Sequence, residues 1–211
     1  MKTVIINASP RKNWNTAQLL REAQRGAEER GAETEYVDLY DLQFTGCRSC
    51  LACKAKGADR CKCYWKDDLS SLIDRILNAD ALIIGTPIYF GEPTAQFRAL
   101  LERLLFCVLS YDGEGSYYEG SLDIGVIYTM NAPEQYYESG MKPSLEKTEF
   151  VLGRLLKGNV RSYASCDTVQ VKDYSKYSMG NFDGDAKNAR REIQFPEDMK
   201  KAYEMGRELG K

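Results

Sequence analysis

The chain of 211 residues contains no histidine. Without an imidazole, neither a Ser-His-Asp triad nor a Cys-His nucleophile pair can form. A catalytic zinc ion held by histidines is excluded for the same reason. If the protein is an enzyme, we therefore expect an organic or sulfur-bound cofactor to carry its reaction.

The sequence also lacks long hydrophobic runs and blocks of like charge. No stretch approaches the length of a membrane span, and the apolar run that follows Met1 is too short for a signal peptide. The 29 basic and 31 acidic residues give a net charge of −2. We therefore expect a cytoplasmic protein whose partners are neither membranes nor nucleic acids.

What the sequence does contain is a regular alternation of two patterns. Short apolar runs rich in β-branched residues predict strands at 2–7, 34–39, 81–85, 122–130 and 160–171. Apolar residues at helical spacing predict helices at 16–30, 67–78, 94–108, 142–156 and 196–209, the last with Pro196 in its first turn. Strands that alternate with helices predict an α/β fold, in which a parallel sheet is covered on both faces.

Five such units favour a doubly wound, flavodoxin-like sheet of five parallel strands in the order 2-1-3-4-5. We expect one domain over 1–211, with a cysteine-rich insertion at about 43–66 and a C-terminal extension from about 173. Ligands of such sheets bind outside the carboxyl ends of the strands, between the first and the third. The loops after these two strands are therefore the candidate site.

The loop after the first strand carries Ser9, Asn13, Asn15 and Thr16 just before a helix begins. It contains neither the dinucleotide fingerprint nor a P-loop motif. Free backbone amides and the positive end of the helix dipole meet there and favour an anion, and Arg11 adds a charge suited to phosphate. The alternative is a plain capping loop, in which Asn15 or Thr16 only caps the helix.

The loop after the third strand places Tyr89 and Phe90 between Pro87 and Gly91. A rigid loop with two aromatic rings suits a flat, mostly apolar ring with polar edges. The alternative is an ordinary turn into the next helix, with both aromatic rings packed inward. Flavin mononucleotide (FMN) has a phosphate at one end and an isoalloxazine ring at the other, so it would satisfy both loops.

Several motifs together resemble the NADPH-dependent FMN reductases and iron–sulfur flavoproteins of the flavodoxin-like superfamily. They are S-P-R-x-x-x-N-T from Ser9, A-D-A-L-I-I-G-T-P-I-Y-F-G from Ala79, the following T-A-Q-F-R-A-L-L-E-R-L-L-F, and D-Y-S-K-Y ahead of F-P-E-D-M-K-K-A-Y. The resemblance covers nearly the whole chain. It departs at Ala8, where relatives usually have glycine, and at Trp14, which could narrow access to the cofactor or contact a neighbouring subunit.

The resemblance implies an FMN site and assigns residues to it. The phosphate would be bound by Ser9, Arg11, Asn15 and Thr16. The flavin ring would be bordered by Pro87, Ile88, Tyr89, Phe90 and Gly91, and reached by Asn131 after the fourth strand. The resemblance also implies a homodimer or homotetramer, and the aromatic stretches 111–120 and 130–140 are candidates for covering the flavin or forming the subunit interface.

Five of the seven cysteines lie within 17 residues. In a chain without a secretion signal, this pattern indicates metal ligands or redox thiols before disulfides. By their spacing and by resemblance to iron–sulfur flavoproteins, Cys47, Cys50, Cys53 and Cys61 are candidate ligands of a [4Fe–4S] cluster. Structural zinc, redox-active thiols and plain loop cysteines remain alternatives.

Our first hypothesis is an enzyme, an NAD(P)H-dependent FMN reductase that passes electrons from NAD(P)H through FMN to a small-molecule or protein acceptor. The flavin carries the chemistry, so no residue is named as catalytic. The second hypothesis is an iron–sulfur flavoprotein with FMN and [4Fe–4S] that carries electrons without a small-molecule substrate. The third is a redox sensor based on the cysteines. The acceptor, and the choice between NADH and NADPH, stay open at this stage.

Overall fold

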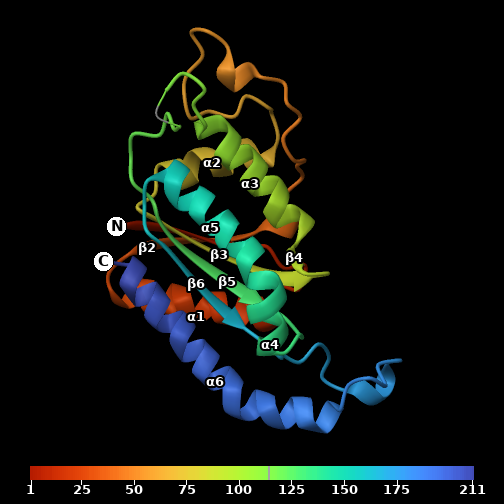
Figure 1. The fold of residues 1–211 in the computed structure, drawn as a ribbon. Helices are drawn as coiled ribbons and strands as arrows, with labels where there is room; N and C mark the ends of the chain where they lie inside the picture. The colour runs from red at the N-terminus through yellow and green to blue at the C-terminus, as the bar shows by residue number, and fades with distance from the viewer. Residues whose placement is uncertain (114) are drawn as a thin grey trace.

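The computed structural model describes residues 1–113 and 115–211. Five strands run parallel: β1 (Lys2–Asn7), β2 (Glu33–Asp38), β3 (Ala81–Tyr89), β5 (Asp123–Thr129) and β6 (Val160–Ser165). They lie in the order β2-β1-β3-β5-β6, and the short β4 (Glu92–Pro93) pairs antiparallel with the end of β3 (Figure 1). With β4 set aside this is the predicted order 2-1-3-4-5, so the predicted fold is confirmed.

Helices cover both faces of the sheet (Figure 1). They are α1 (Asn15–Glu29), α2 (Asp68–Leu77), α3 (Ala95–Val108), the single turn α4 (Glu134–Tyr136), α5 (Lys142–Leu156) and α6 (Gly184–Leu209). The pair α1 and α6 lies on one face, and α2, α3 and α5 lie on the other. Within the described residues, no helix combines the length and the apolar character needed to cross a membrane.

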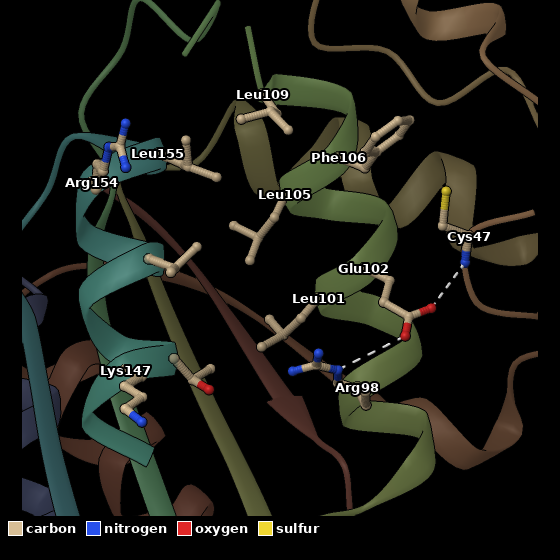
Figure 2. Close-up of a pocket in the computed structure, with 12 residues that line it drawn as sticks. Cys47, Arg98, Leu101, Glu102, Leu105, Phe106, Leu109, Lys147, Arg154 and Leu155 are labelled. Carbon is tan, nitrogen blue, oxygen red and sulfur yellow. Dashed lines mark hydrogen bonds and ion pairs between the residues drawn. The ribbon is translucent and has the colours of Figure 1, made fainter. Parts of the chain in front are cut away.

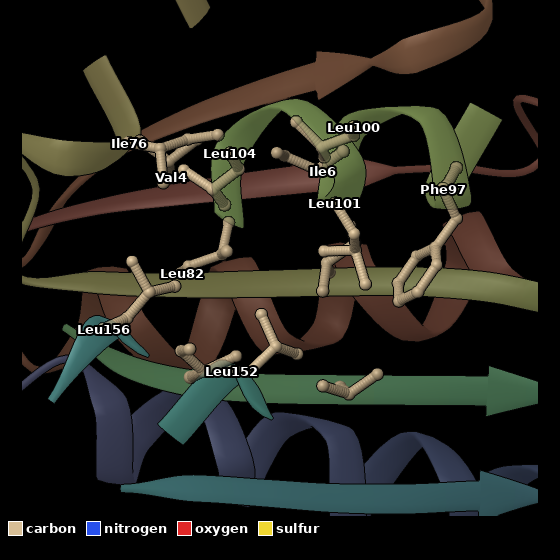
Figure 3. Close-up of a cluster of buried hydrophobic side chains, with 14 of the residues drawn as sticks. Val4, Ile6, Ile76, Leu82, Phe97, Leu100, Leu101, Leu104, Leu152 and Leu156 are labelled. Carbon is tan, nitrogen blue, oxygen red and sulfur yellow. The ribbon is translucent and has the colours of Figure 1, made fainter. Parts of the chain in front are cut away.

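Strand β1 is buried on both faces of the sheet, and its side chains alternate between the two layers of helices. Val4 and Ile6 are fully buried among side chains of α2, α3 and α5, such as Leu104 (Figure 3). Ile5 points to the opposite face and packs with α1 and α6, where Leu20 is a neighbour. Each such side chain contributes about 1.5–3 kcal/mol on burial, so both layers stabilise the strand that leads into the candidate site.

Two predicted strand boundaries are wrong. Strand β3 continues beyond Gly85 to Tyr89, because residues 86 and 87 pair with the end of β5 and residues 88 and 89 pair with β4. The last strand ends at Ser165, since the chain turns at Asp167, whose φ is 57° and whose amide donates to the Ala132 carbonyl. The segment 166–171 is therefore free to approach the carboxyl ends of the other strands.

The final helix begins at Gly184, not at the predicted Pro196. Its first turn is capped by Asp183, whose side chain accepts a hydrogen bond from the Ala186 amide at 3.0 Å. A proline inside a helix removes one backbone hydrogen bond. Here the preceding Phe195 is buried against the sheet, so tertiary packing holds the helix together through Pro196. The extra turns bring α6 next to the start of α1.

Candidate functional site

A cleft of about 150 Å³ lies at the carboxyl ends of β1, β3 and β5. Residues from the last part of β3 and β5, from the start of α1 and from the segments after β1, β5 and β6 line it: Ser9, Arg11, Trp14, Asn15, Thr16, Pro87, Ile88, Tyr89, Thr129, Met130, Asn131, Thr168, Val169 and Gln170. Of the residues predicted for FMN, all but Phe90 and Gly91 are among them. The structure therefore gathers the two predicted loops and Asn131 at the predicted switch point of the sheet.

The loop after β1 is shaped by short-range hydrogen bonds. The Asn7 Oδ1 accepts from the Ser9 amide at 3.1 Å, and the Ser9 Oγ accepts from the Arg11 amide at 3.1 Å. Ser9 is 3% exposed and still has its own hydroxyl proton to donate. No side chain of the described residues caps the start of α1, so the first-turn amides at Asn15 and Thr16 remain suited to an anion.

The segment after β6 already occupies several donors of this loop. Asn15 Nδ2 and Trp14 Nε1 donate to the Val169 carbonyl at 2.9 and 3.2 Å. Arg11 Nη1 donates to the Gln170 carbonyl at 2.5 Å. An anion in the cleft would therefore meet Ser9 and the backbone amides directly. Trp14 fills the space between loop and segment within one chain, which accounts for its size.

The loop after β3 is a tight β-hairpin. Phe90 and Gly91 form its two-residue turn, with φ of 54° and 86°, as in the turns that match the twist of paired strands. The Phe90 side chain is fully exposed, whereas Tyr89 is 45% exposed and lines the cleft. The predicted ring-bordering loop is thus divided: Pro87, Ile88 and Tyr89 lie at the cleft, and the other two residues form the projecting tip.

Thr94 connects the two loops. Its Oγ1 donates to the Ala8 carbonyl at 2.8 Å, and its amide donates to the Thr86 Oγ1 at 3.2 Å. The Thr94 Oγ1 also accepts a hydrogen bond from the Phe97 amide at 3.3 Å and so caps the N-terminus of α3. Thr94 is 2% exposed, so these bonds are shielded from water. The relative position of the loops is therefore set by a buried side chain that does not line the cleft.

Asn131 contributes an acceptor without a partner. Its Nδ2 lies 3.4 Å from the Gln170 Oε1, while its Oδ1 is buried and has no hydrogen-bond partner among the described residues. A buried acceptor left unpaired costs about 1–3 kcal/mol. If the side chain turned toward the cleft, which Asn131 lines, a ligand hydroxyl or N–H group would remove that cost. Deeper in the cleft, Thr16 Oγ1 and Thr129 Oγ1 share a hydrogen bond of 2.8 Å.

Sequence reasoning missed part of the lining. Thr129 ends β5, Met130 follows it, and residues 168–170 come after β6, so the rule that ligands bind at the carboxyl ends of strands could have found them. Residues 168–170 were missed because the last strand was predicted to extend over 160–171. The aromatic stretch 130–140 reaches the cleft through Met130 and Asn131. The other aromatic stretch, 111–120, does not reach the cleft: its residues 116–120 line a separate cavity of about 1010 Å³ together with residues 59–62. Residue 114 of this stretch lies outside the described residues.

The cysteine-rich segment forms a second, narrower pocket. Cys47, Cys50, Cys53, Cys63 and Cys107 line it, whereas Cys61, the predicted fourth ligand, lines the 1010 Å³ cavity instead. No three cysteine or carboxylate side chains of the described residues are close enough together to hold one metal ion. None of the seven cysteines forms a disulfide.

The backbone of this segment is locally strained. Ser49, Leu51 and Cys61 adopt positive φ between 53° and 59°, a region that non-glycine residues seldom occupy. Burial raises the pKa of the Cys53 thiol above its ordinary value, which makes its thiolate still scarcer at neutral pH. The five thiols around this pocket have the donor chemistry of an iron–sulfur site, but no three of them are close enough together to hold one metal ion.

A third feature is an apolar groove of about 590 Å³ between α3 and α5 (Figure 2). Leu101, Leu105 and Leu155 line it, and Arg98, Glu102, Lys147 and Arg154 stand at its edges. It is larger than the cleft at the strand ends but contains few convergent polar groups. Its position away from the strand ends makes it a surface feature and not part of the candidate site.

Relatives of the chain include iron–sulfur flavoproteins. It is 39% identical to one from Methanocaldococcus jannaschii over 103 residues, which are 49% of this chain and 51% of that protein. It is 28% identical to one from Clostridioides difficile over 178 residues, 70% of this chain and 77% of the other. The chain spans about half the length of the first relative and, similarly, of one from Methanosarcina thermophila that is 34% identical.

Solved structures of oxidoreductases share the fold. An NAD(P)H:quinone oxidoreductase from Methanothermobacter marburgensis superposes with a TM-score of 0.74 at 20% identity, covering 100% of this chain and 98% of the other. An azoreductase from Bacillus anthracis gives 0.67 at 14% identity and covers 99% of both chains. The model of the NADPH-dependent FMN reductase family matches residues 1–118. Because this match spans more than half of the 211 residues, the chain belongs to the NADPH-dependent FMN reductase family.

Proposed function

We propose that this protein is an FMN-dependent oxidoreductase that takes electrons from NAD(P)H and delivers them to an acceptor. The observation that carries the proposal is the cleft in which the loops after β1, β3 and β5 meet. When bound, FMN supplies two-electron redox chemistry between a reduced nicotinamide, which gives up a hydride, and the acceptor. Family membership supports both the flavin and the nicotinamide donor.

The residues of the cleft fit the parts of FMN. The buried Ser9 hydroxyl and the first-turn amides of α1 would hold the phosphate. Pro87, Ile88 and Tyr89 would border the ring. The unpaired Asn131 Oδ1 would accept from a hydroxyl or N–H group of the ligand. The cleft is smaller than the ~300–1,000 Å³ of most small-molecule sites, so part of the molecule would extend over the exposed hairpin beside Tyr89.

The test is an FMN titration followed by reduction without oxygen. We expect the purified protein to bind FMN stoichiometrically and NAD(P)H to bleach the flavin absorption. A Ser9→Ala variant should bind FMN about tenfold more weakly, because the phosphate loses a hydrogen bond made by a buried donor. A Ser71→Ala variant, with its hydroxyl on the exposed side of α2, is the control. Protein that neither contains FMN nor takes it up would refute the proposal.

A second candidate function rests on the cysteine pocket and on the iron–sulfur flavoproteins among the relatives. In this case the protein would hold a [4Fe–4S] cluster besides FMN and carry single electrons to a partner protein. The pocket favours Cys47, Cys50, Cys53 and Cys63 as its thiol ligands, with Cys63 in place of the Cys61 that the spacing predicted. The strained segment would have to rearrange to bring these sulfurs together.

Two serine variants of anaerobically purified protein test this candidate. We expect Cys63→Ser to lose the bound iron and sulfide together with the broad absorption of the cluster, while Cys61→Ser keeps all three. Loss in Cys61→Ser alone would restore the ligand set predicted from spacing. Absence of iron and sulfide from the unmodified protein would exclude the candidate and leave the FMN proposal unaffected.

A further inference from the structure

The C-terminal helix α6 carries a cation to the phosphate end of the cleft. Arg191 Nη1 donates to the Asn15 Oδ1 at 2.7 Å, and Nη2 donates to the Gln18 Oε1 at 3.1 Å. Both acceptors belong to the beginning of α1, the helix whose N-terminus faces the cleft. Arg191 lies outside residues 1–118, the part of the chain that the family model matches.

Arg191 has no carboxylate partner within 4.0 Å among the described residues. Its two side-chain acceptors are neutral amides, and the guanidinium lies 4.0 Å from the centre of the Phe195 ring. The neighbouring cation Lys187, by contrast, is paired with Asp167. Burial without a compensating charge disfavours a cation and lowers the pKa of Arg191. A bound anion nearby would supply the missing compensation.

The contact with Asn15 fixes the first turn of α1. Both polar atoms of the Asn15 side chain form hydrogen bonds: its Oδ1 accepts from Arg191, and its Nδ2 donates to the Val169 carbonyl at 2.9 Å. The Trp14 ring lies near two guanidinium groups, 5.3 Å from that of Arg11 and 5.9 Å from that of Arg191. The loop, the segment after β6 and α6 are therefore connected at this one point.

We propose that Arg191 is a positioning residue for the phosphate of FMN and sets the preference of the protein for FMN over riboflavin. It acts by holding Asn15, which orients the first-turn amides of α1, and by adding a positive charge beside them. FMN and riboflavin share the ring and the ribityl chain and differ only in the phosphate. A residue that serves the phosphate therefore changes the ratio of their affinities. This inference rests on the proposed FMN function.

The experiment measures dissociation constants for FMN and riboflavin by quenching of flavin fluorescence. The variants are Arg191→Ala, Arg191→Lys and the control Lys200→Ala, which removes an equal charge from an exposed position of the same helix. We expect Arg191→Ala to weaken FMN binding by about tenfold and riboflavin binding by less than about twofold. Arg191→Lys should recover part of the preference for FMN, because an ammonium keeps the positive charge but cannot form both hydrogen bonds, to Asn15 and to Gln18, as the guanidinium does. Lys200→Ala should bind like the unmodified protein.

Two results would overturn the inference. Equal weakening of FMN and riboflavin in Arg191→Ala would show that the residue only stabilises the fold, and unchanged affinities would show that it serves neither ligand. If the unmodified protein binds FMN and the ratio stays constant in Arg191→Ala, this inference fails while the proposed function stands. If the unmodified protein does not bind FMN, both fail together. Thermal unfolding of each variant confirms that the folded protein is being compared.

Discussion

Arg103 donates two hydrogen bonds to the Cys63 sulfur, from Nε at 3.3 Å and from Nη2 at 3.2 Å. Its guanidinium also pairs with Asp67 at 2.5 Å and donates to the Thr45 and Trp65 carbonyls. The side chain is 2% exposed. A single arginine of α3 therefore holds both ends of the cysteine-rich segment against the body of the protein.

Replacing this arginine should destabilise the protein strongly. In Arg103→Ala the Asp67 carboxylate, which is 12% exposed, loses its cation, and removal of one partner of a buried ion pair costs about 3–5 kcal/mol. We expect the free energy of unfolding, measured in urea at pH 7, to fall by that amount. The control Arg98→Ala removes an exposed cation 3.8 Å from Glu102 and should cost less than about 1 kcal/mol. Similar losses in both variants would contradict this account of the segment.

The cysteines should differ in their reactivity toward iodoacetamide. Cys47 and Cys50 are exposed, whereas Cys53 and Cys107 are buried, and burial raises the pKa of both buried thiols. The thiolate is the reacting form, so a raised pKa leaves less of it at neutral pH and more as pH increases. We expect peptide mapping at pH 7.5 to find Cys47 and Cys50 modified first and Cys107 modified only after unfolding. Uniform labelling rates in the folded protein would be inconsistent with the pocket.

Most of the fold could be predicted because the strands are short, apolar and separated by amphipathic helices. The predicted limits of β1 and of α5 agree with the structure to the residue. The prediction was wrong where tertiary contacts decide the local structure. Proline is a poor residue inside a helix, but buried contacts on both sides of Pro196 hold α6 against the sheet: Phe195 packs in the core, and Asp198 accepts hydrogen bonds from side chains of β6. Sequence patterns do not report such contacts.

The candidate site was predicted in part for a similar reason. Ser9 and Tyr89 come after the predicted strands 2–7 and 81–85, whose order could be inferred, so their meeting at one edge of the sheet could be inferred as well. Nothing in the sequence links Asn15 to Arg191, which lies 176 residues further along the chain. The same holds for Cys63: spacing favoured Cys61, and only the path of the folded segment turns Cys63 toward the other thiols.

Thr94 offers a test of how the two loops of the cleft are held together. A Thr94→Val variant keeps the shape of the side chain but loses the bond to the Ala8 carbonyl and the cap of α3. Loss of a helix cap costs about 0.5–2 kcal/mol. We expect a drop of that size in unfolding free energy and weaker binding of both FMN and riboflavin, because the loops lose their common anchor. Thr94→Ser retains the hydroxyl and should restore both properties; failure to do so would argue against the hydrogen bonds as the cause.

The groove between α3 and α5 is expected to be covered by a second copy of the chain. Its floor is apolar, and Val151 beside it is 39% exposed. Glu102 stands on one side and Lys147 on the other, so two copies related by a two-fold axis could pair opposite charges across it. We predict a homo-oligomer by light scattering at micromolar concentration, and a smaller species for Val151→Asp. Ile193→Asp, at a 77% exposed position on α6, should leave the mass unchanged. A mass of 23.9 kDa for the unmodified protein would disprove the prediction.

Close contact between α1 and α6 depends on two glycines. A Cβ atom at Gly206 would lie 1.9 Å from the Ala23 carbonyl oxygen, and one at Gly26 would lie 2.1 Å from that of Tyr203. Both obstacles are backbone atoms, so a Gly206→Ala variant must separate the helices. Such overpacking costs about 1–3 kcal/mol.

The same separation would move α6 relative to Asn15 and so disturb the contact made by Arg191. We therefore expect Gly206→Ala to lower the unfolding free energy and also to reduce the preference for FMN over riboflavin. Gly180→Ala adds a methyl group where no atom lies within 4 Å and serves as the control. A Gly206→Ala protein that is less stable but keeps its full preference for FMN would show that the position of α6 does not affect the phosphate end of the cleft.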